Sequence, residues 1–274
     1  MTKSAKVCIL RTAGINCDKE TAFAFKKAGG VPEFVHINRL INQENNIHDY
    51  HILAIPGGFS YGDDIASGKI FANELKNKLG PALKKFVNDG KLIIGICNGF
   101  QVLVKSGLLP GNETLEQETS LIINDVGKFQ DCWVYLRLPV AGCRSPVKCV
   151  WTKDLPEIIY LPVAHGEGKF VVKDKAVLEK LKKNHQIVFQ YCDDKAKLSG
   201  YPYNPNGSVE NIAGICDETG HILGLMPHPE RHAYPEQHPN WTDIKTHSVK
   251  RTARNYGDGL QIFKNGVEYV RRTL

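Results

Sequence analysis

Short apolar segments alternate with longer amphipathic ones through the first half of the chain. Four short segments are predicted as strands: 7–10, 33–36, 51–55 and 92–96. Segments 18–28 and 71–88 place apolar residues three or four positions apart and are predicted as helices. Strands that alternate with helices predict right-handed βαβ units and a parallel sheet covered by helices, with ligands bound at the carboxyl ends of the strands.

The pattern changes from Gln130 onward, where strand-like segments follow one another closely. These segments are predicted as strands: 132–138, 148–151, 157–164, 168–173, 186–192, 213–217 and 221–226. Turn signals between them, such as Asn-Pro-Asn-Gly at 204–207, favour antiparallel hairpins. Segment 258–274 carries apolar residues at helical spacing and predicts a final helix over the sheet, whereas 234–257 is a long polar loop.

Together these patterns predict an α/β fold with a mixed, mainly parallel central sheet that is flanked by helices and extended by antiparallel strands. The sequence shows no repeat, low-complexity tract or linker, so residues 1–274 are expected to form a single domain. With 42% hydrophobic residues the chain can bury a full core. The sequence shows no secretory leader and no apolar run long enough for a membrane span, so we expect a cytoplasmic location without membrane contact.

The cysteines and the charge exclude several classes of protein. The eight cysteines form no C-x-x-C pair and several lie in apolar segments, which favours reduced thiols over a disulfide framework or a zinc site. The net charge of +6 comes partly from predicted helix surfaces. No basic array with interleaved aromatic residues accompanies it, so no nucleic-acid partner is expected. Loops as long as 234–257 are usually functional, and we interpret this one as a contact for a partner protein.

One cysteine stands in a setting that suits a nucleophile. Cys97 follows the predicted strand 92–96 and precedes a predicted helix, with Gly95 and Gly99 on either side. Such a sharp strand-to-helix turn strains the backbone of the nucleophile and demands small neighbours. The N-terminus of the helix favours the thiolate form of the sulfur. The alternative is an inert cysteine in the core, and the turn alone does not decide between the two.

A base with an orienting carboxylate follows the strand predicted at 221–226. His228 and Glu230 are separated by Pro229, which biases His228 toward an extended conformation. Residues i and i+2 of an extended chain face the same side, so Glu230 can hold one ring nitrogen of His228 while the other faces a cysteine. The alternative is a surface turn in which His and Glu are incidental.

An acyl-transfer site also needs hydrogen-bond donors for the oxyanion. The amide of Asn98 directly follows the nucleophile, and Gly58, after the third predicted strand, lets a second amide approach closely. The segment GDDIASGKI resembles a phosphate-binding loop. However, five residues rather than four separate Gly62 from Gly68, and Ile70 replaces the required Ser or Thr. Nucleotide binding by this loop is therefore not expected.

Six motifs occur in an order and at spacings typical of one family: PGGFSYGD, GICNGFQ, LPVAHGEGKF, NPNGS, IAGI and GLMPHPERH. Together they resemble the glutaminase subunit of phosphoribosylformylglycinamidine synthase, a class I glutamine amidotransferase of purine biosynthesis with a flavodoxin-like architecture. The resemblance covers most of the chain. It implies that Cys97 attacks the carboxamide carbon of glutamine, that His228 shuttles the proton and that Glu230 orients His228. Ammonia leaves first, and water then hydrolyses the glutamyl thioester to glutamate.

The resemblance also implies residues around the bound glutamine. Gln101 lies one helical turn beyond the nucleophile, and His165, Gly166 and Glu167 look like the substrate-side loop of the family. His165 is a rival for the role of base but does not stand in the family's catalytic position. Cys17 is a rival nucleophile at a predicted helix start, but it lacks the flanking glycines and is expected to be structural.

In this family the ammonia passes to a larger synthetase subunit, which uses ATP to convert formylglycinamide ribonucleotide to formylglycinamidine ribonucleotide. The resemblance implies that ATP and Mg²⁺ belong to that partner, that this chain holds no cofactor or metal, and that a small accessory subunit also takes part. The loop 234–257 and the surface near Cys97 are the candidates for docking.

Two other functions stay open. A cysteine amidohydrolase of the peptidase-like branch of this architecture would place His directly after the nucleophile, where this chain has Asn98. A non-catalytic binding subunit would have lost Cys97, His228 or Glu230, and all three are present.

Overall fold

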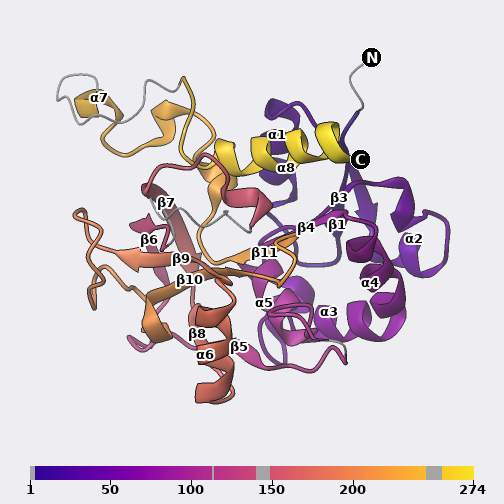
Figure 1. Cartoon of the computed structure of the whole chain (residues 1–274), viewed down its shortest axis with the longest axis horizontal. Coiled ribbons are helices and arrows are strands. Elements are labelled where there is room, and N and C mark those ends of the chain that lie inside the picture. The colour runs from indigo at the N-terminus through magenta and orange to yellow at the C-terminus, as the bar shows by residue number, and fades with distance from the viewer. Residues whose placement is uncertain (1–3, 113, 140–148, 245–254) are drawn as a thin grey trace.

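The computed structural model describes residues 4–112, 114–139, 149–244 and 255–274. Its strands are β1 (Lys6–Arg11), β2 (Val31–His36), β3 (Ile52–Ile55), β4 (Leu92–Ile96), β5 (Thr119–Ile122), β6 (Gln130–Arg137), β7 (Ile158–His165), β8 (Lys169–Val172), β9 (Ile187–Cys192), β10 (Ile212–Cys216) and β11 (Ile222–Leu225). Within these residues one nine-stranded sheet has the order β2-β1-β3-β4-β11-β10-β9-β6-β7, and β5 pairs with β8 separately (Figure 1).

The large sheet has two halves. In the parallel half, β2, β1, β3, β4 and β11 pair in parallel. In the antiparallel half, β10, β9, β6 and β7 continue the sheet from β11 with antiparallel pairs only. The predicted mixed α/β sheet is confirmed, and within the described residues its antiparallel pairings equal its parallel ones in number. The middle strands β3, β4, β11 and β10 are buried at every position because both faces of the sheet are covered there.

Helices cover both faces of the parallel half. The α-helices of the described residues are α1 (Asp18–Lys27), α2 (Ile37–Ile41), α3 (Lys69–Glu74), α4 (Gly80–Asn88), α5 (Asn98–Lys105), α6 (Lys175–Lys183), α7 (Trp241–Ile244) and α8 (Leu260–Thr273). Of these, α6 lies beside β8 in the antiparallel part and α7 lies in the loop 234–257 (Figure 1). α1 and α8 lie side by side on one face, where the rings of Phe25 and Phe263 meet edge to face with centroids 4.9 Å apart (Figure 1). α3, α4 and α5 lie on the other face (Figure 1). The predicted C-terminal helix is confirmed as α8.

The predicted helix 71–88 is one helical segment whose winding changes in the middle. A π-helical turn, Leu75–Leu79, joins α3 to α4. Pro81 stands in the first turn of α4, and because proline has no amide hydrogen to donate, the change of winding falls where the helical hydrogen-bond ladder is already interrupted.

The strand predicted at 148–151 is wrong. Val150–Thr152 forms a 3-10 turn, and Lys148 lies outside the described residues. Trp151 is fully buried beside α8: its Nε1 donates to the carbonyl of His221 at 3.0 Å, and its own carbonyl accepts from Asn265 at 2.8 Å. A buried tryptophan with both of these groups satisfied needs no strand partner.

The predicted polar loop 234–257 contains a short 3-10 turn, Pro235–Gln237, followed by α7. Residues 245–254 of this loop lie outside the described residues. No helix in the described part of the chain is both long enough and apolar enough to cross a membrane.

Candidate active site

Four loops meet beyond the carboxyl ends of the parallel strands. The segments after β1, β3, β4 and β11 carry Cys17, Gly57, Cys97 and His228 respectively. A Cβ atom placed on Gly57 would stand 2.9 Å from Cε1 of His228, 3.1 Å from Sγ of Cys17 and 3.4 Å from Cβ of Cys97. The three side chains therefore surround one point, and only glycine leaves room for them at position 57.

Cys97 occupies the predicted sharp turn between β4 and α5. Its backbone has φ 51° and ψ −106°, a strained conformation for a residue with a side chain. Its amide donates to the carbonyl of Leu225 at 2.8 Å, which ties the turn to β11. A Cβ on Gly99 would lie 1.9 Å from the carbonyl oxygen of Ile55, and one on Gly95 would lie 2.5 Å from that of Gly99. The strained turn and its need for glycine on both sides are confirmed.

His228 and Glu230 form a buried hydrogen-bonded pair. Nδ1 of His228 lies 2.6 Å from Oε1 of Glu230, and both side chains are almost fully buried. The amide of His228 donates to the carbonyl of Pro162 in β7 at 2.8 Å, which fixes the start of this loop. Burial opposes a positive charge on His228, but Glu230 and Cys97 outweigh burial and hold the pKa of His228 well above its ordinary value. The site therefore stabilises an imidazolium.

The other ring nitrogen of His228 is not held by a hydrogen bond. Within the described residues Nε2 has no hydrogen-bond partner, and the thiols of Cys97 and Cys17 lie near enough to the ring to help raise its pKa. Sγ of Cys97 also lies 3.7 Å from the carbonyl oxygen of Ala164 near the end of β7. Because Glu230 holds Nδ1, Nε2 is the atom that can take a proton from Cys97.

The two amides predicted as oxyanion donors belong to Gly58 and Asn98. Gly58 has φ 144° and packs so closely on the loop after β1 that a Cβ would lie 2.7 Å from the carbonyl oxygen of Gly14. Neither Gly58 nor Asn98 donates its amide to an acceptor within the described residues. Oδ1 of Asn98 accepts from the amide of Ser60 at 3.2 Å. The Asn98 side chain thus holds the loop that carries Gly58, a role that the sequence did not reveal.

The predicted substrate-side residues lie together on one wall of the site. Nε2 of Gln101 donates to the carbonyl of Glu167 at 2.6 Å, and Oε1 of Gln101 accepts from Asn98 at 2.9 Å. Gly166 accepts through its carbonyl from the amide of Asn124 at 2.9 Å. Gln101 therefore links α5 to the loop 165–168 instead of standing free in the pocket.

His165 lies close to His228 but differs from it in its charge state. Its side chain is buried against Gly168, where a Cβ would stand 2.3 Å from the ring. Burial, together with the nearby charge of His228, lowers the pKa of His165 to about 4. No carboxylate of the described residues bonds its ring nitrogens. His165 is therefore a neutral imidazole at pH 7 and lacks the orienting partner that His228 has.

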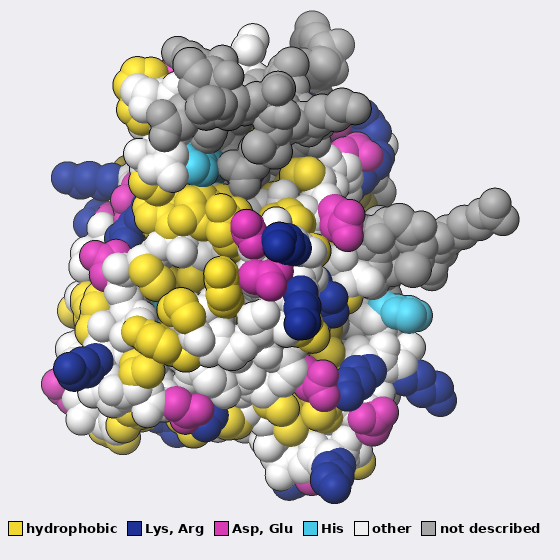
Figure 2. All heavy atoms as spheres, turned by 90° about the vertical axis from the view of Figure 1, so that its left-hand side faces the viewer, with side chains coloured by type: hydrophobic (Ala, Val, Ile, Leu, Met, Phe, Trp, Pro, Cys, Tyr) yellow, Lys and Arg dark blue, Asp and Glu magenta, His cyan; other side chains and the backbone are white. Residues whose placement is uncertain are grey.

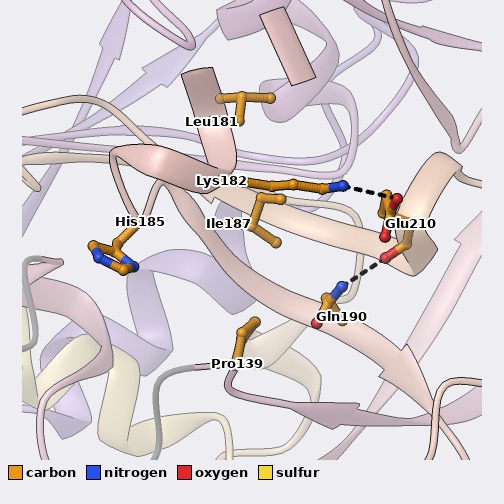
Figure 3. Close-up of a pocket in the computed structure, with 7 residues that line it drawn as sticks. All are labelled: Pro139, Leu181, Lys182, His185, Ile187, Gln190 and Glu210. Atoms are coloured by element: carbon orange, nitrogen blue, oxygen red, sulfur yellow. Dashed lines mark hydrogen bonds and ion pairs between the residues drawn. The ribbon is translucent and has the colours of Figure 1, made fainter. Parts of the chain in front are cut away.

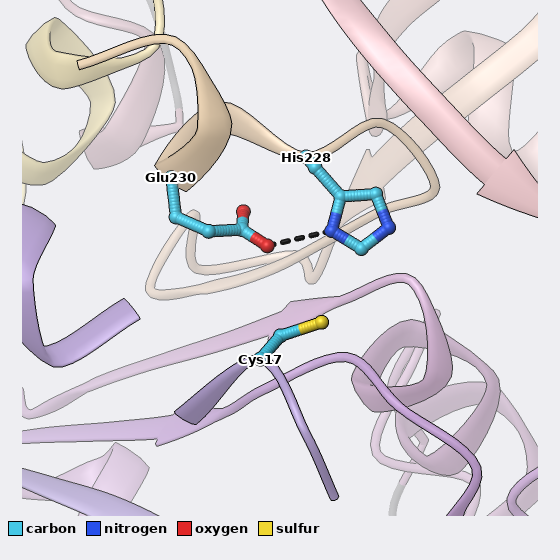
Figure 4. A group of neighbouring side chains, drawn as sticks. All are labelled: Cys17, His228 and Glu230. Atoms are coloured by element: carbon cyan, nitrogen blue, oxygen red, sulfur yellow. Dashed lines mark hydrogen bonds and ion pairs between the residues drawn. The ribbon is translucent and has the colours of Figure 1, made fainter. Parts of the chain in front are cut away.

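Cys17, which we expected to be structural, lies in the site. Its sulfur, a ring nitrogen of His228 and a carboxylate oxygen of Glu230 all lie within 4.8 Å of one another (Figure 4). Nη2 of Arg231 donates to Sγ of Cys17 at 3.2 Å and to Glu20 at 3.0 Å. Burial raises the pKa of the Cys17 thiol, so it stays protonated. Its position after β1 could have indicated this neighbourhood, since the ends of parallel strands share one edge.

A separate surface hollow between α6 and β9 holds none of the predicted site residues (Figure 3). It is lined by Pro139, Leu181, Lys182, His185, Ile187, Gln190 and Glu210. Lys182 pairs with the carboxylate of Glu210 at 3.0 Å, and Gln190 donates to the carbonyl of Glu210 at 2.7 Å. Its main polar groups are thus paired with each other, and it has no nucleophile.

A strained cysteine at a strand-to-helix turn, a histidine oriented by a buried carboxylate and two free amides define an enzyme class. Such a site performs acyl transfer through a thioester. Comparison with known proteins identifies the family within this class of enzymes. Over residues 4–270 the chain matches the CobB/CobQ-like glutamine amidotransferase domain.

Individual relatives agree with this match. The chain is 46% identical over 275 residues to phosphoribosylformylglycinamidine synthase subunit PurQ of Methanococcus maripaludis strain C7, with 97% of this chain and 98% of that protein covered. It is 44% identical over 268 residues to the same subunit of Dehalococcoides mccartyi, with 97% and 98% covered. The solved structure of PurLQS from Thermotoga maritima contains a chain that matches with a TM-score of 0.69 and 29% identity, covering 98% of this chain and 100% of that one.

The chain therefore belongs to the glutamine amidotransferases, and among them to the family of the PurQ subunit of phosphoribosylformylglycinamidine synthase. The resemblance stated from the motifs is confirmed. The peptidase-like and non-catalytic alternatives are not favoured.

Proposed function

We propose that this chain hydrolyses glutamine and delivers the ammonia to a synthetase subunit that converts formylglycinamide ribonucleotide to formylglycinamidine ribonucleotide in purine biosynthesis. The observation that carries the proposal is the geometry of Cys97, His228 and Glu230: a nucleophile in a strained turn, next to a base whose far nitrogen is held 2.6 Å from a buried carboxylate. Membership of the PurQ family indicates which substrates the reaction uses.

In the first half of the reaction Cys97 transfers its proton to Nε2 of His228, and Sγ attacks the carboxamide carbon of glutamine. The amides of Gly58 and Asn98 stabilise the developing oxyanion. His228 then gives its proton to the leaving nitrogen, and the C–N bond breaks. The products are ammonia and a glutamyl thioester on Cys97.

In the second half His228 takes a proton from water, which attacks the thioester carbonyl in the same oxyanion site. The C–S bond breaks, the proton returns to the sulfur, and glutamate leaves. Glu230 stabilises the imidazolium in both halves, consistent with the raised pKa of His228. Gln101, His165, Gly166 and Glu167 form the wall against which the amino-acid end of glutamine would bind.

The synthetase partner supplies the chemistry that this site does not perform. We assign ATP and Mg²⁺ to that partner, with no cofactor or metal on this chain, and we expect a small accessory subunit in the complex. The name of the Thermotoga maritima structure supports assembly with such subunits. We expect the complex to work in the cytoplasm.

The loop 234–257 and the surface near Cys97 remain our candidates for docking. In the described part of the loop the ring of His238 lies 5.0 Å from that of Tyr160 and 5.8 Å from that of Trp133, centroid to centroid. Hydrophobic side chains gather on the side of the molecule where β6 and β7 lie (Figure 2). The loop thus packs on strands that present aromatic rings, as a docking surface would.

The decisive experiment is labelling of the full chain with a glutamine-derived diazoketone, followed by peptide mapping. We expect one modified residue, Cys97, and protection by glutamine but not by asparagine. Modification of Cys17 in place of Cys97 would overturn the assignment of the nucleophile. Equal protection by asparagine would instead favour a different cysteine amidohydrolase.

A further inference from the structure

Lys105, at the end of α5, is a buried lysine that the reaction does not use. It lies on the helix face that also carries Asn98 and Gln101, at positions i, i+3 and i+7. Only 5% of its side chain is exposed. Lysine is almost never buried to this extent unless it is paired, so its partners indicate what it does.

The partners of Lys105 come from two separate loops. Nζ donates to the carbonyl oxygen of Ser67 at 2.6 Å and lies 3.8 Å from Oε2 of Glu167. The amide of Ser67 lies 3.4 Å from the same carboxylate oxygen. Burial lowers the pKa of Lys105, while the charges of Glu167 and Asp63 oppose that shift and favour the ammonium. One cation therefore joins the loop after β3 to the loop after β7.

The loop after β3 needs such external support. Tyr61 and Asp63 have φ values of 56° and 55°, which are unfavourable for residues with side chains. Oδ1 of Asp63 accepts from the amide of Gly68 and from Nδ2 of Asn98, both at 3.1 Å. A strained segment persists only when contacts around it hold it in place, and here they converge on α5.

The same two loops both carry residues of the proposed glutamine site. The loop after β3 carries the oxyanion donor Gly58, and the loop 165–168 carries Glu167, whose carbonyl is held by Gln101 at 2.6 Å. Through its hydrogen bonds Gln101 ties only the second loop to α5, and Asn98 ties only the first. Lys105 is the described side chain on α5 that makes polar contacts with both loops.

We propose that Lys105 is a positioning residue for the glutaminase reaction: it locks the loop 57–68 and the loop 165–168 together at the separation that binds glutamine. This inference rests on the proposed function. Lys105 touches neither substrate nor Cys97 and acts through Ser67 and Glu167. When the contacts that support a site are removed, its loops become less well positioned. The substrate is then no longer held in reactive geometry, even though the catalytic residues are still present.

The test compares two electrophiles on the full chain carrying Lys105→Met. Iodoacetamide needs only an accessible Cys97 thiol, whereas the glutamine-derived diazoketone must also be held between the two loops. We expect the rate constant for the diazoketone to fall by about 10- to 100-fold, with that for iodoacetamide within about threefold of the wild type. Lys85→Met is the matched control, because the exposed side chain of Lys85 on α4 pairs with Asp89 at 2.8 Å. Both labelling rates of this control should stay unchanged.

Conservative replacement separates positioning from general stability. Lys105→Arg keeps the charge and should restore most of the diazoketone rate. Equal rates of diazoketone labelling in wild type and Lys105→Met would overturn the proposal, and so would an equal loss of both labelling rates. If Lys105→Met does not fold, Lys105→Gln takes its place with the same expected and contrary outcomes. Failure of the wild-type chain to react with the diazoketone at Cys97 would instead refute the proposed function.

Discussion

The parallel and antiparallel halves of the sheet contribute different things to the site. The parallel half brings four strand ends to one edge, and the proposed nucleophile, the proposed base and both proposed oxyanion donors lie in the segments that follow them. The antiparallel half contributes backbone carbonyls of β7 and the loop 165–168. Antiparallel strands end alternately at opposite edges, so they cannot gather as many reactive side chains at one place. The proposed reacting groups therefore lie at the strand ends of the parallel half, and the antiparallel half contributes one side of the site.

The two halves nevertheless meet at the chemistry. β7 is the last strand in the sheet order, yet the carbonyl of Pro162 accepts from the amide of His228 at 2.8 Å. The carbonyl of Ala164 lies 3.7 Å from the sulfur of Cys97. The end of the antiparallel half thus closes over the site built by the parallel half. Substitutions in the two halves should therefore have different consequences.

The largest difference is expected for cysteines. Cys97→Ala should lower glutamine hydrolysis by at least about 10⁴-fold without unfolding the chain, because no other thiol stands in the strained turn. Cys132→Ala, on β6 of the antiparallel half, should leave activity unchanged. Steady-state glutamate production measures both. Substantial glutamine hydrolysis by Cys97→Ala would contradict the assignment of the nucleophile to the parallel half of the sheet.

Removal of the orienting carboxylate should have the next largest effect. Glu230→Gln should lower kcat by about 10²- to 10⁴-fold, because His228 loses both its fixed ring orientation and the charge that stabilises the imidazolium. The pKa of His228 should fall, since Glu230 is the main group that raises it. Kinetics and an NMR titration of the imidazole measure these changes. An unchanged pKa of His228 would contradict the pairing.

Replacing one glycine in each half of the sheet by alanine should have different effects on kcat, for steric reasons alone. Gly58→Ala should lower kcat by about 100-fold, because the new Cβ would collide with Gly14 and Asn16 and displace an oxyanion donor. Gly200→Ala, in the connection after β9, is the control, because a Cβ there meets no atom within 4 Å. If both variants retain wild-type kcat, Gly58 does not take part in the oxyanion site.

The smallest predicted effect is on the free energy of unfolding at acidic pH. The pKa of His165 is depressed to about 4 in the folded chain, so the unfolded chain binds more protons between pH 6.5 and 4, and the free energy of unfolding falls as the pH drops through this window. Between pH 7 and pH 5 His165 should account for a loss of about 2 kcal/mol. Urea denaturation of wild type and His165→Gln at both pH values isolates the contribution of His165 to the free energy of unfolding, since His228 is present in both proteins. Identical pH dependence of the two would show that His165 titrates normally.

Much of this site was predictable because its residues obey local rules. The glycines beside Cys97 and the proline between His228 and Glu230 mark backbone conformations that neighbouring residues impose on each other. The strand at 148–151 was predicted wrongly because the burial of Trp151 beside α8 depends on residues more than a hundred positions away. The position of Cys17 beside His228 was also missed, although its place after a predicted parallel strand was a signal for it.

The sequence by itself determined the alternation of strands and helices, the strained turn at Cys97 and the pair His228 and Glu230, since all of these depend on the nearest residues along the chain. The tertiary structure alone decided that Gly57 stands between three side chains, that Cys17 lies beside the base and that Lys105 joins two loops. These contacts join segments that are distant in sequence, and their distances depend on how the strands are ordered in the sheet. No local pattern of residues encodes that order.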